Sequence, residues 1–390
     1  MRRHDQTTIL AICTVAFFVT FFARMAISPV IPFISEDFSV TNTQIGIALS
    51  GMWLAYGLAQ YPSGILGDRF GERTIVLLAV GGTTVMSFFL ALSTVFAIFV
   101  VFVVVLGGFA GLHYSPATAL LARTNDNLGR AVGVHMFGSP AAGLIAPIVA
   151  AWVAVRWGWR PAVATALIVG IPTYALIVWG VPKTSPRRPD ESIRSRLAAG
   201  GGGDVLLRPA IAFTLLIAML GTFVIQGLLS FLPMFLGEYH GYSATVAGIG
   251  FSAFFVLRAI SQFLLGTISD TYGRDTAIAG AMAIGAIGLS SLVILSGDLV
   301  IAVAVGLSGF GMGFLAVIDP RFIEAMGEKE QGAGFGFVRT FYTVFGAAGS
   351  VAVGFLADTF GWDVSILVLS GMLAIATIAL LVNRIFTLGY

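Results

Sequence analysis

One ten-residue stretch, Gly64-Ile-Leu-Gly-Asp-Arg-Phe-Gly-Glu-Arg73, occurs again 202 residues later as Gly266-Thr-Ile-Ser-Asp-Thr-Tyr-Gly-Arg-Asp275. The same shift keeps many other residues in register, from Thr20 on Thr222 onwards. Near the end of each half the register slips by one residue, so that Gly158 falls on Gly361. A repeat of this length indicates two homologous halves.

The composition places both halves in a membrane. Hydrophobic residues make up 57% of the chain and charged residues only 10%, and the mean hydropathy is +0.96. These values lie far outside the range of soluble proteins. At about 20 to 25 residues per crossing, the 390 residues accommodate roughly twelve transmembrane helices. The fold class predicted is therefore an all-α membrane protein with two six-helix bundles.

Hydropathy gives the expected extent of each helix. The first half contains helices at about 7–34, 43–66, 74–95, 97–122, 130–155 and 161–181. The second half contains helices at about 209–236, 244–267, 276–296, 299–322, 331–357 and 363–383. The predicted domains are an N-terminal bundle over 1–181 and a C-terminal bundle over 209–390. Parallel halves of this kind are one of the plans found in membrane transporters.

Residues 182–208 form the predicted linker between the bundles. The segment contains three prolines, the glycine run Gly200–Gly203 and several basic residues, Arg194 among them. We expect it to be hydrophilic and mobile. Orientation follows from the basic residues, because sixteen of the 21 fall in segments that are cytoplasmic if the N-terminus is inside. Both termini are therefore predicted to be cytoplasmic, in a multi-pass protein of the plasma membrane.

Several classes of site are not expected. The single cysteine, Cys13, allows no intrachain disulfide and suggests no metal site. The first apolar segment is too long for a cleaved signal peptide. No basic tract indicates nucleic-acid binding, no cofactor motif occurs, and no nucleophile–base constellation suggests an enzyme.

Three arginines lie inside the expected helices: Arg24, Arg258 and Arg339. His113 lies inside the fourth helix, whereas the third, sixth, ninth and twelfth helices have no charged residue in their interiors. An arginine facing lipid at the bilayer centre costs about 2.5–3.5 kcal/mol. None of the nineteen acidic residues lies in the middle third of a helix. The midplane is therefore cationic, and an anion is the expected partner.

The repeated stretch resembles the signature between the second and third helices of the major facilitator superfamily, and the resemblance extends over the whole chain. Only Glu72 departs from it, because a basic residue is usual at that position. The resemblance implies that helices 1, 2, 4, 5, 7, 8, 10 and 11 line a cavity. It also implies that Asp68 caps the eleventh helix in an outward-open state. The implied gating residues are Gly64, Asp68, Arg69, Gly71, Arg73 and Asp270.

The repeat also suggests a substrate site near the midplane. A pseudo-twofold axis sets Arg24 opposite Gln226 and Tyr56 opposite Arg258, and places His113 and Arg339 against apolar residues. Guanidinium grips a carboxylate through two parallel hydrogen bonds. The predicted substrate-binding residues are Arg24, Tyr56, His113, Gln226, Arg258 and Arg339.

Some of these residues also have a structural interpretation. Arg24 suits a role in holding carbonyl groups where Pro29 and Pro32 interrupt the helix. Arg339 suits an ion pair with Asp319 or Glu324 at the cytoplasmic side. Elsewhere, Gly107 with Gly111, and Gly309 with Gly313, are predicted to mediate helix packing.

A finer resemblance favours the organic-anion branches of the superfamily. Arg24 with Ser28, Pro29 and Pro32 is similar to the first helix of anion:cation symporters, and Arg258 to the eighth-helix arginine of oxalate:formate and monocarboxylate carriers. The fourth helix lacks the arginine and glutamate of the anion:cation branch. The predicted function is therefore secondary transport of a small carboxylate by alternating access, with the substrate held by arginines between the bundles.

Other functions and the coupling remain alternatives. A drug-efflux antiporter is the second prediction, because the stretch Gly138–Gly143 partly resembles the fifth-helix motif of antiporters. A receptor of transporter type would need a signalling domain. For coupling we expect either a proton bound by His113, whose reference pKa is near 6.5, or exchange against a counter-anion. The family expectation is a monomer in the lipid bilayer.

Overall fold

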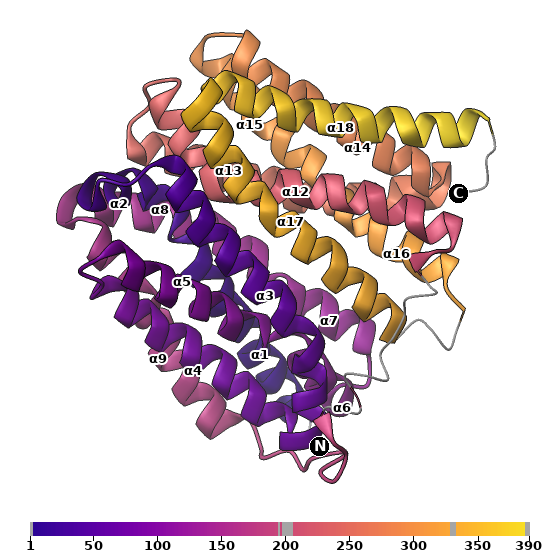
Figure 1. Cartoon of the computed structure of the whole chain (residues 1–390). Helices are drawn as coiled ribbons and strands as arrows, with labels where there is room; N and C mark the ends of the chain where they lie inside the picture. The colour runs from indigo at the N-terminus through magenta and orange to yellow at the C-terminus, as the bar shows by residue number, and fades with distance from the viewer. Residues whose placement is uncertain (1–2, 194–195, 197–205, 328–332, 387–390) are drawn as a thin grey trace. The chain divides into compact units, whose positions relative to one another are not determined.

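The computed structural model describes residues 3–193, 196, 206–327 and 333–386. This part of the chain is helical and contains no strand (Figure 1). The chain divides into two compact units. Unit 1 comprises Met1–Val40 and Gly51–Ala199, and unit 2 comprises Thr41–Ser50 and Gly200–Tyr390. Two features of the predicted linker, Arg194 and the glycine run 200–203, lie outside the described residues.

The lengths of the helices fit a membrane protein. In the described part of the chain, eleven helical segments are long and apolar enough to span a bilayer. One more expected span, α3 (Asn42–Phe70), has 29 residues, but Gln44, Ser50, Gln60 and other polar residues lower its hydropathy. The predicted all-α fold with membrane helices is confirmed.

Unit 1 contains the first half of the repeat. Besides most of α3, its helices are α1 (Arg3–Met25), η1 (Ser28–Val30), α2 (Ile31–Phe38), α4 (Glu72–Ala91), α5 (Phe96–Gly111), α6 (Tyr114–Thr124), α7 (Leu128–Met136), α8 (Gly138–Trp157) and α9 (Trp159–Gly180). The first nine residues of α3 belong to unit 2 and the remainder to unit 1.

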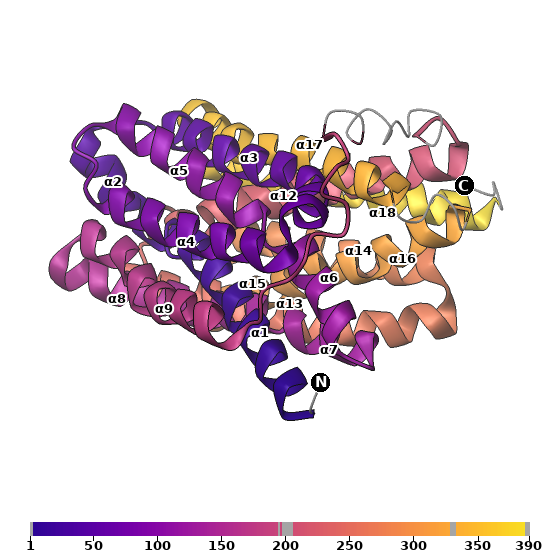
Figure 2. The same ribbon diagram turned by 90° about the horizontal axis from the view of Figure 1, so that it is seen from below.

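Unit 2 contains the second half of the repeat. Its helices are α12 (Pro209–Glu238), α13 (Ala244–Tyr272), α14 (Arg274–Ile294), α15 (Asp298–Gly311), η2 (Met312–Phe314), α16 (Leu315–Ala325), α17 (Ala333–Phe360) and α18 (Trp362–Ile385). Corresponding helices pack in corresponding ways: α1 against α8 and α4 against α9 in unit 1, α12 against α17 and α14 against α18 in unit 2 (Figure 2).

Several predicted membrane helices are interrupted where their residues disfavour a regular helix. The first is interrupted by η1, which contains Pro29. The fourth breaks between α5 and α6, so that His113 stands at the break. The tenth breaks at η2, the corresponding place in the second half of the repeat. Both of these breaks follow a glycine-rich turn that ends in Gly111 or Gly311.

The paired glycines pack as predicted. A Cβ atom on Gly107 would strike the carbonyl oxygen of Met52 in α3, and one on Gly309 would strike that of Phe254 in α13. Gly111 likewise meets the Tyr56 carbonyl. Backbones that approach this closely leave no room for a side chain. The positions of α5 on α3, and of α15 on α13, are fixed by these contacts.

The start of the linker is bound to unit 1, which corrects the prediction of a mobile segment over residues 182–193. The main-chain N–H groups of Arg187 and Arg188 donate to the carbonyl oxygen of Asp68, at 2.8 and 3.0 Å. Thr184 accepts from the main-chain N–H of Arg73 at 3.1 Å through its hydroxyl. The signature loop, rich in unpaired backbone groups at helix ends, supplies the partners that hold this segment.

Candidate functional site

Arg24 lies in the last turn of α1, where the helix ends ahead of η1. Its side chain is 1% exposed. Its Nε atom donates to the carbonyl oxygen of Thr20 at 3.1 Å. The structural interpretation is thus partly realised, because Arg24 does hold a carbonyl group of its own helix. The Nη2 atom has no hydrogen-bond partner in the described residues.

Three aromatic rings surround the Arg24 guanidinium. Its Cζ atom lies 4.1 Å from the ring centroid of Tyr56, 4.9 Å from that of Phe21 and 5.2 Å from that of Trp53. Each cation–π contact of this kind is worth about 0.5–2 kcal/mol. The rings hold the charge without neutralising it. Within the described residues Arg24 forms no ion pair.

Trp53 adds a second unsatisfied donor to this group. It is buried on α3, one turn before Tyr56, and its Nε1 atom has no hydrogen-bond partner among the described residues. A buried indole N–H normally finds an acceptor. Unit 1 therefore presents one cation and two unsatisfied donors, Arg24 Nη2 and Trp53 Nε1, in one aromatic environment. This is the donor set that a carboxylate requires.

His113 does not stand alone. It is 0% exposed and stacks on Phe17 of α1, with ring centroids 5.5 Å apart and planes 8° apart. His135 of α7, also 0% exposed, stacks on Phe17 at 5.0 Å and lies 5.4 Å from His113. The four ring nitrogens of these histidines reach no hydrogen bond within the described residues, although His135 faces the main chain of Cys13.

Unit 2 contains the second group of predicted residues. Arg258 of α13 is partly exposed, forms no ion pair in the described chain, and has an unpartnered Nε atom. Gln226 of α12 is buried, and its Oε1 atom is unpartnered within the described residues. Nearby, the Ser350 hydroxyl donates to the carbonyl oxygen of Gln226 at 3.3 Å and lies 2.6 Å from the Ser230 hydroxyl.

Arg339 has a different environment. It lies on α17, one turn before Thr343, whose hydroxyl donates to its carbonyl oxygen at 2.7 Å. The acids considered as its partners bind other groups: Asp319 accepts from the Tyr342 hydroxyl at 2.8 Å, and Glu324 pairs with Arg274 at 2.9 Å. The substrate role of Arg339 stays a prediction.

The signature residues bind the linker and one another. Asp68 pairs with Arg196 at 2.8 Å, and Arg69 Nη1 donates to the Glu191 carbonyl oxygen at 3.3 Å. Gly64 faces Ser115 of α6. In unit 2, Asp270 pairs with Arg274 at 2.9 Å. The capping of the eleventh helix by Asp68 concerns another conformational state and stays a prediction.

The backbone conformation explains why a glycine occurs near the end of each signature stretch. Gly71 and Gly273 precede α4 and α14 with φ of +87° and +90°. Residues with a side chain rarely adopt such angles. A Cβ atom on Gly71 would also meet the carbonyl oxygen of Thr184 at 2.5 Å, inside the docked linker.

Glu72, the one departure from the family signature, has a clear role in the structure. Its side chain is 1% exposed and receives Arg123 at 2.7 Å and Arg187 at 3.0 Å. The repeat places Arg274 at the corresponding position of unit 2, where its partner is Glu324. The two halves thus use the same kind of ion pair with the charges exchanged.

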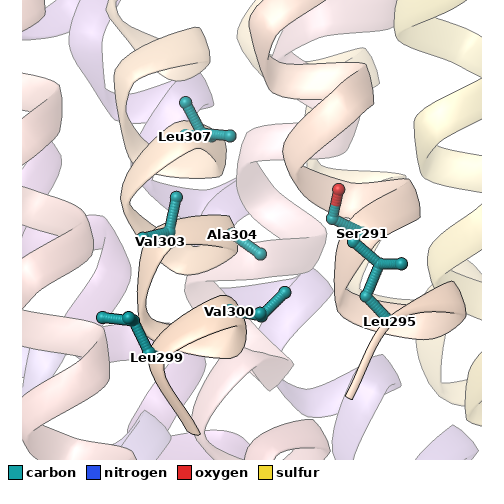
Figure 3. Close-up of a pocket in the computed structure, with 7 residues that line it drawn as sticks. All are labelled: Ser291, Leu295, Leu299, Val300, Val303, Ala304 and Leu307. Atoms are coloured by element: carbon teal, nitrogen blue, oxygen red, sulfur yellow. The ribbon is translucent and has the colours of Figure 1, made fainter. Parts of the chain in front are cut away.

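Two other kinds of site receive no support. No group of three or more His, Cys, Asp or Glu side chains in the described chain is arranged to hold a metal ion. A groove of about 270 Å³ between α14 and α15 is lined by six apolar residues and Ser291 (Figure 3). Its lining carries no charge and lacks the donors found around Arg24, so it does not suit an anion.

The sequence profile of the Major Facilitator Superfamily matches residues 13–318 and 214–387. The chain belongs to the major facilitator superfamily. A bacterial homologue of the human lysosomal transporter Spinster, in an inward-facing and occupied conformation, has a similar fold, with a TM-score of 0.83, 16% identity and 98% of each chain covered. The superfamily consists of membrane transporters rather than enzymes.

Three curated members of the superfamily illustrate its range. The hexuronate transporter of Bacillus subtilis (strain 168) is 21% identical over 71% of this chain and 68% of its own length. The probable L-galactonate transporter of Escherichia coli (strain K12) is 31% identical over 43% and 37%. A multidrug resistance protein B homologue of Mycobacterium tuberculosis (strain H37Rv) is 29% identical over 38% and 28%.

Within this superfamily fold, sequence reasoning missed Trp53, His135 and the partners of Glu72. Trp53 and Tyr56 are three residues apart and therefore share one face of α3. That spacing was a usable signal. The sequence holds no comparable signal for His135, because its approach to His113 depends on how α7 packs against α1 and α6.

Proposed function

We propose that this chain is a secondary transporter of a small organic anion, a carboxylate, working by alternating access of its two halves. The observation that carries the proposal is the Arg24 group: a buried cation with a free Nη2 atom, held by aromatic rings beside the unsatisfied Nε1 of Trp53. Leaving two buried donors unpaired costs about 1–3 kcal/mol each. A carboxylate oxygen at these donors would remove that cost.

The unsatisfied groups favour an acid that also carries hydroxyl groups. In unit 2 the unsatisfied groups include a donor, Arg258 Nε, and an acceptor, Gln226 Oε1. A carboxylate accepts but cannot donate, so only a hydroxyl or an amine of the substrate would satisfy Gln226. A sugar acid has both kinds of group. The names of the hexuronate and L-galactonate transporters support this substrate class.

The setting we propose follows from the basic residues and the family. The protein would lie in the plasma membrane as a monomer, with both termini in the cytoplasm. Coupling would use either a proton, with His113 as the acceptor, or exchange against a counter-anion. Arg339 and Tyr56 are proposed as further substrate ligands, and the residues Gly64, Asp68, Arg69, Gly71, Arg73 and Asp270 as the gate.

Thermal stabilisation of the purified protein tests the proposal. The panel contains mono- and dicarboxylates, D-glucuronate, D-galacturonate, L-galactonate, nitrate, phosphate and tetraphenylphosphonium. We expect sugar acids to raise the Tm of the wild type. Arg24→Gln and Arg258→Gln should weaken binding about 10- to 100-fold, because each loses charge-assisted hydrogen bonds worth about 1.5–3 kcal/mol.

Arg156→Gln is the matched control, because Arg156 is an exposed arginine whose recorded contacts are with Trp152 of its own helix. It should bind like the wild type. Uptake of the stabilising acid into proteoliposomes then tests transport. Absence of stabilisation by every anion of the panel would contradict the proposal.

A multidrug-efflux antiporter is the second candidate, favoured by the likeness to the multidrug resistance protein B homologue. The Arg24 group argues against a cationic drug, since a guanidinium repels it. Stabilisation by tetraphenylphosphonium that persists in Arg258→Gln would favour this candidate over anion transport.

A further inference from the structure

The Arg24 group of unit 1 lies beside a second buried cluster, because its Phe21 ring is 6.5 Å from the ring of Phe17. Phe17 of α1 packs against both His113, at the break between α5 and α6, and His135 near the end of α7. Both imidazoles are fully buried, and their four nitrogens are without hydrogen bonds in the described chain. Two buried polar rings so close together, both unsatisfied, are unexpected for packing alone.

We propose that His113 and His135 form one proton-binding site whose occupancy is controlled by the anion at Arg24. This inference rests on the proposed function and deepens it by naming the coupling ion and a second residue of its site. The proton comes from bulk water and is held at a ring nitrogen of either imidazole. A neutral imidazole has one nitrogen free to accept a proton, and each of these rings has such a nitrogen unoccupied.

The geometry favours one proton rather than two. The ring centroids are only 5.4 Å apart, and the site excludes water. Two positive charges at this distance in a poorly polarisable environment repel strongly. A proton on one ring therefore opposes a second proton on the other, and the pair titrates as a unit.

Arg24 is the residue through which a bound anion would control the protonation of the histidine pair. Its guanidinium lies 4.9 Å from the ring centroid of Phe21, which is 6.5 Å from the ring of Phe17, and Phe17 stacks on His113. With Arg24 uncompensated, its positive charge disfavours a proton on the pair. A carboxylate bound to Arg24 cancels that charge and makes protonation favourable. By linkage, the proton then strengthens anion binding by the same factor, which is the coupling that symport requires.

The other titratable groups around the pair do not replace this control. Cys13 and Arg24 lie on α1, and Tyr114 lies on α6 against His135. The helices α4, α5, α8 and α9, which pack around α1 and α6, carry their charged side chains only at their ends. Arg24 is thus the one permanent charge in the membrane interior of the described part of unit 1.

Calorimetric titration of the detergent-purified protein with the stabilising sugar acid measures the proton directly. Binding is recorded near neutral pH in two buffers that differ in ionisation enthalpy, so that the difference gives the protons taken up. We expect roughly one proton per anion for the wild type. Proton uptake on binding also means that anion affinity falls as the pH rises.

The double variant His113→Gln/His135→Gln should bring proton uptake close to zero while anion binding persists, whereas each single variant keeps one imidazole and should still take up a proton. His240→Gln is the matched control, because His240 lies outside the pair and bonds to the carbonyl oxygen of Leu292. It should keep the wild-type uptake. Unchanged uptake in the double variant would overturn the two-histidine site, and uptake lost already in one of the single variants would reduce it to a single residue.

A second measurement separates this inference from the transport proposal. Histidine-selective isotope labelling gives NMR titrations of all four imidazoles without any substrate. If the pair exists, His135→Gln moves the titration of His113 towards higher pH, because a repelling neighbour is removed, and Arg24→Gln does the same. An unchanged His113 titration in both variants would overturn the site even if no anion binds. Anion binding with no proton uptake would leave the transport proposal intact and refute the coupling.

Discussion

At the scale of single residues, Arg24 keeps a charge where no acid among the described residues pairs with it. Aromatic rings cover the guanidinium, and the carbonyl oxygen of Thr20 accepts a hydrogen bond from its Nε atom. Replacing a neighbouring ring by an acid would neutralise the site permanently. Rings instead hold the cation in place while leaving its charge for a substrate. The proposed anion would therefore meet a cation that the surrounding side chains have not neutralised.

Trp53 permits a test of this account. Trp53→Phe keeps an aromatic face towards Arg24 but removes the buried N–H that has no partner. We expect the Tm of the ligand-free protein to stay equal or rise, because an unsatisfied donor has been removed. Anion binding should weaken about 10-fold, since a hydrogen bond to a charged group is lost.

Trp152→Phe is the matched control. It removes an indole in the same way, but from an exposed residue on α8. It should leave binding unchanged. If Trp53→Phe lowers the Tm of the ligand-free protein and leaves anion affinity alone, Trp53 is a packing residue and not part of the anion site.

At the scale of helices, glycine spacing sets where α5 can lie. Gly107 faces the carbonyl oxygen of Met52, whereas the neighbouring Gly108 has only the Ala55 Cβ atom, 4.0 Å away. Gly107→Ala should therefore force α5 off α3 and lower the yield and Tm of folded protein. Gly108→Ala should be neutral or slightly stabilising, because alanine favours the helix by up to about 1 kcal/mol.

Fluorescence-detected size exclusion and a thermal melt of both variants would check this prediction. Equal melting temperatures for the two variants would show that the close contact of α5 with α3 does not limit stability.

These helices also show how far the sequence could be interpreted. The repeat and hydropathy identified the membrane helices, the paired glycines and Arg24, because each is a local pattern. The break at His113 was missed, since Gly111 and Leu112 also fit a continuous helix. The approach of His135 to His113 was missed because it depends on three helices that lie apart in the sequence. Long-range packing has no signature in a single sequence.

At the scale of the whole molecule, the linker is more ordered at its start than its composition suggests. Prolines and arginines predicted a solvated segment. Within residues 182–193, however, several groups form hydrogen bonds with the signature stretch of unit 1. The reason is Glu72. A basic residue there would repel Arg187, whereas the buried carboxylate receives both Arg187 and Arg123. The departure from the family signature thus gives the basic linker a buried counter-charge in unit 1.

Glu72→Gln tests this consequence. The variant leaves Arg123 and Arg187 without a counter-charge, but both are partly exposed and regain water, so the loss should be about 1–3 kcal/mol rather than the larger cost of breaking a fully buried pair. Hydrogen exchange over residues 182–192 should accelerate markedly, with a lower Tm. Glu191→Gln removes an exposed acid from the same segment and should change either quantity little. Equal exchange in the two variants would mean that the main-chain bonds to Asp68 suffice to dock the linker. A large difference would mean that one buried carboxylate decides whether the connection between the halves of the repeat is held or free.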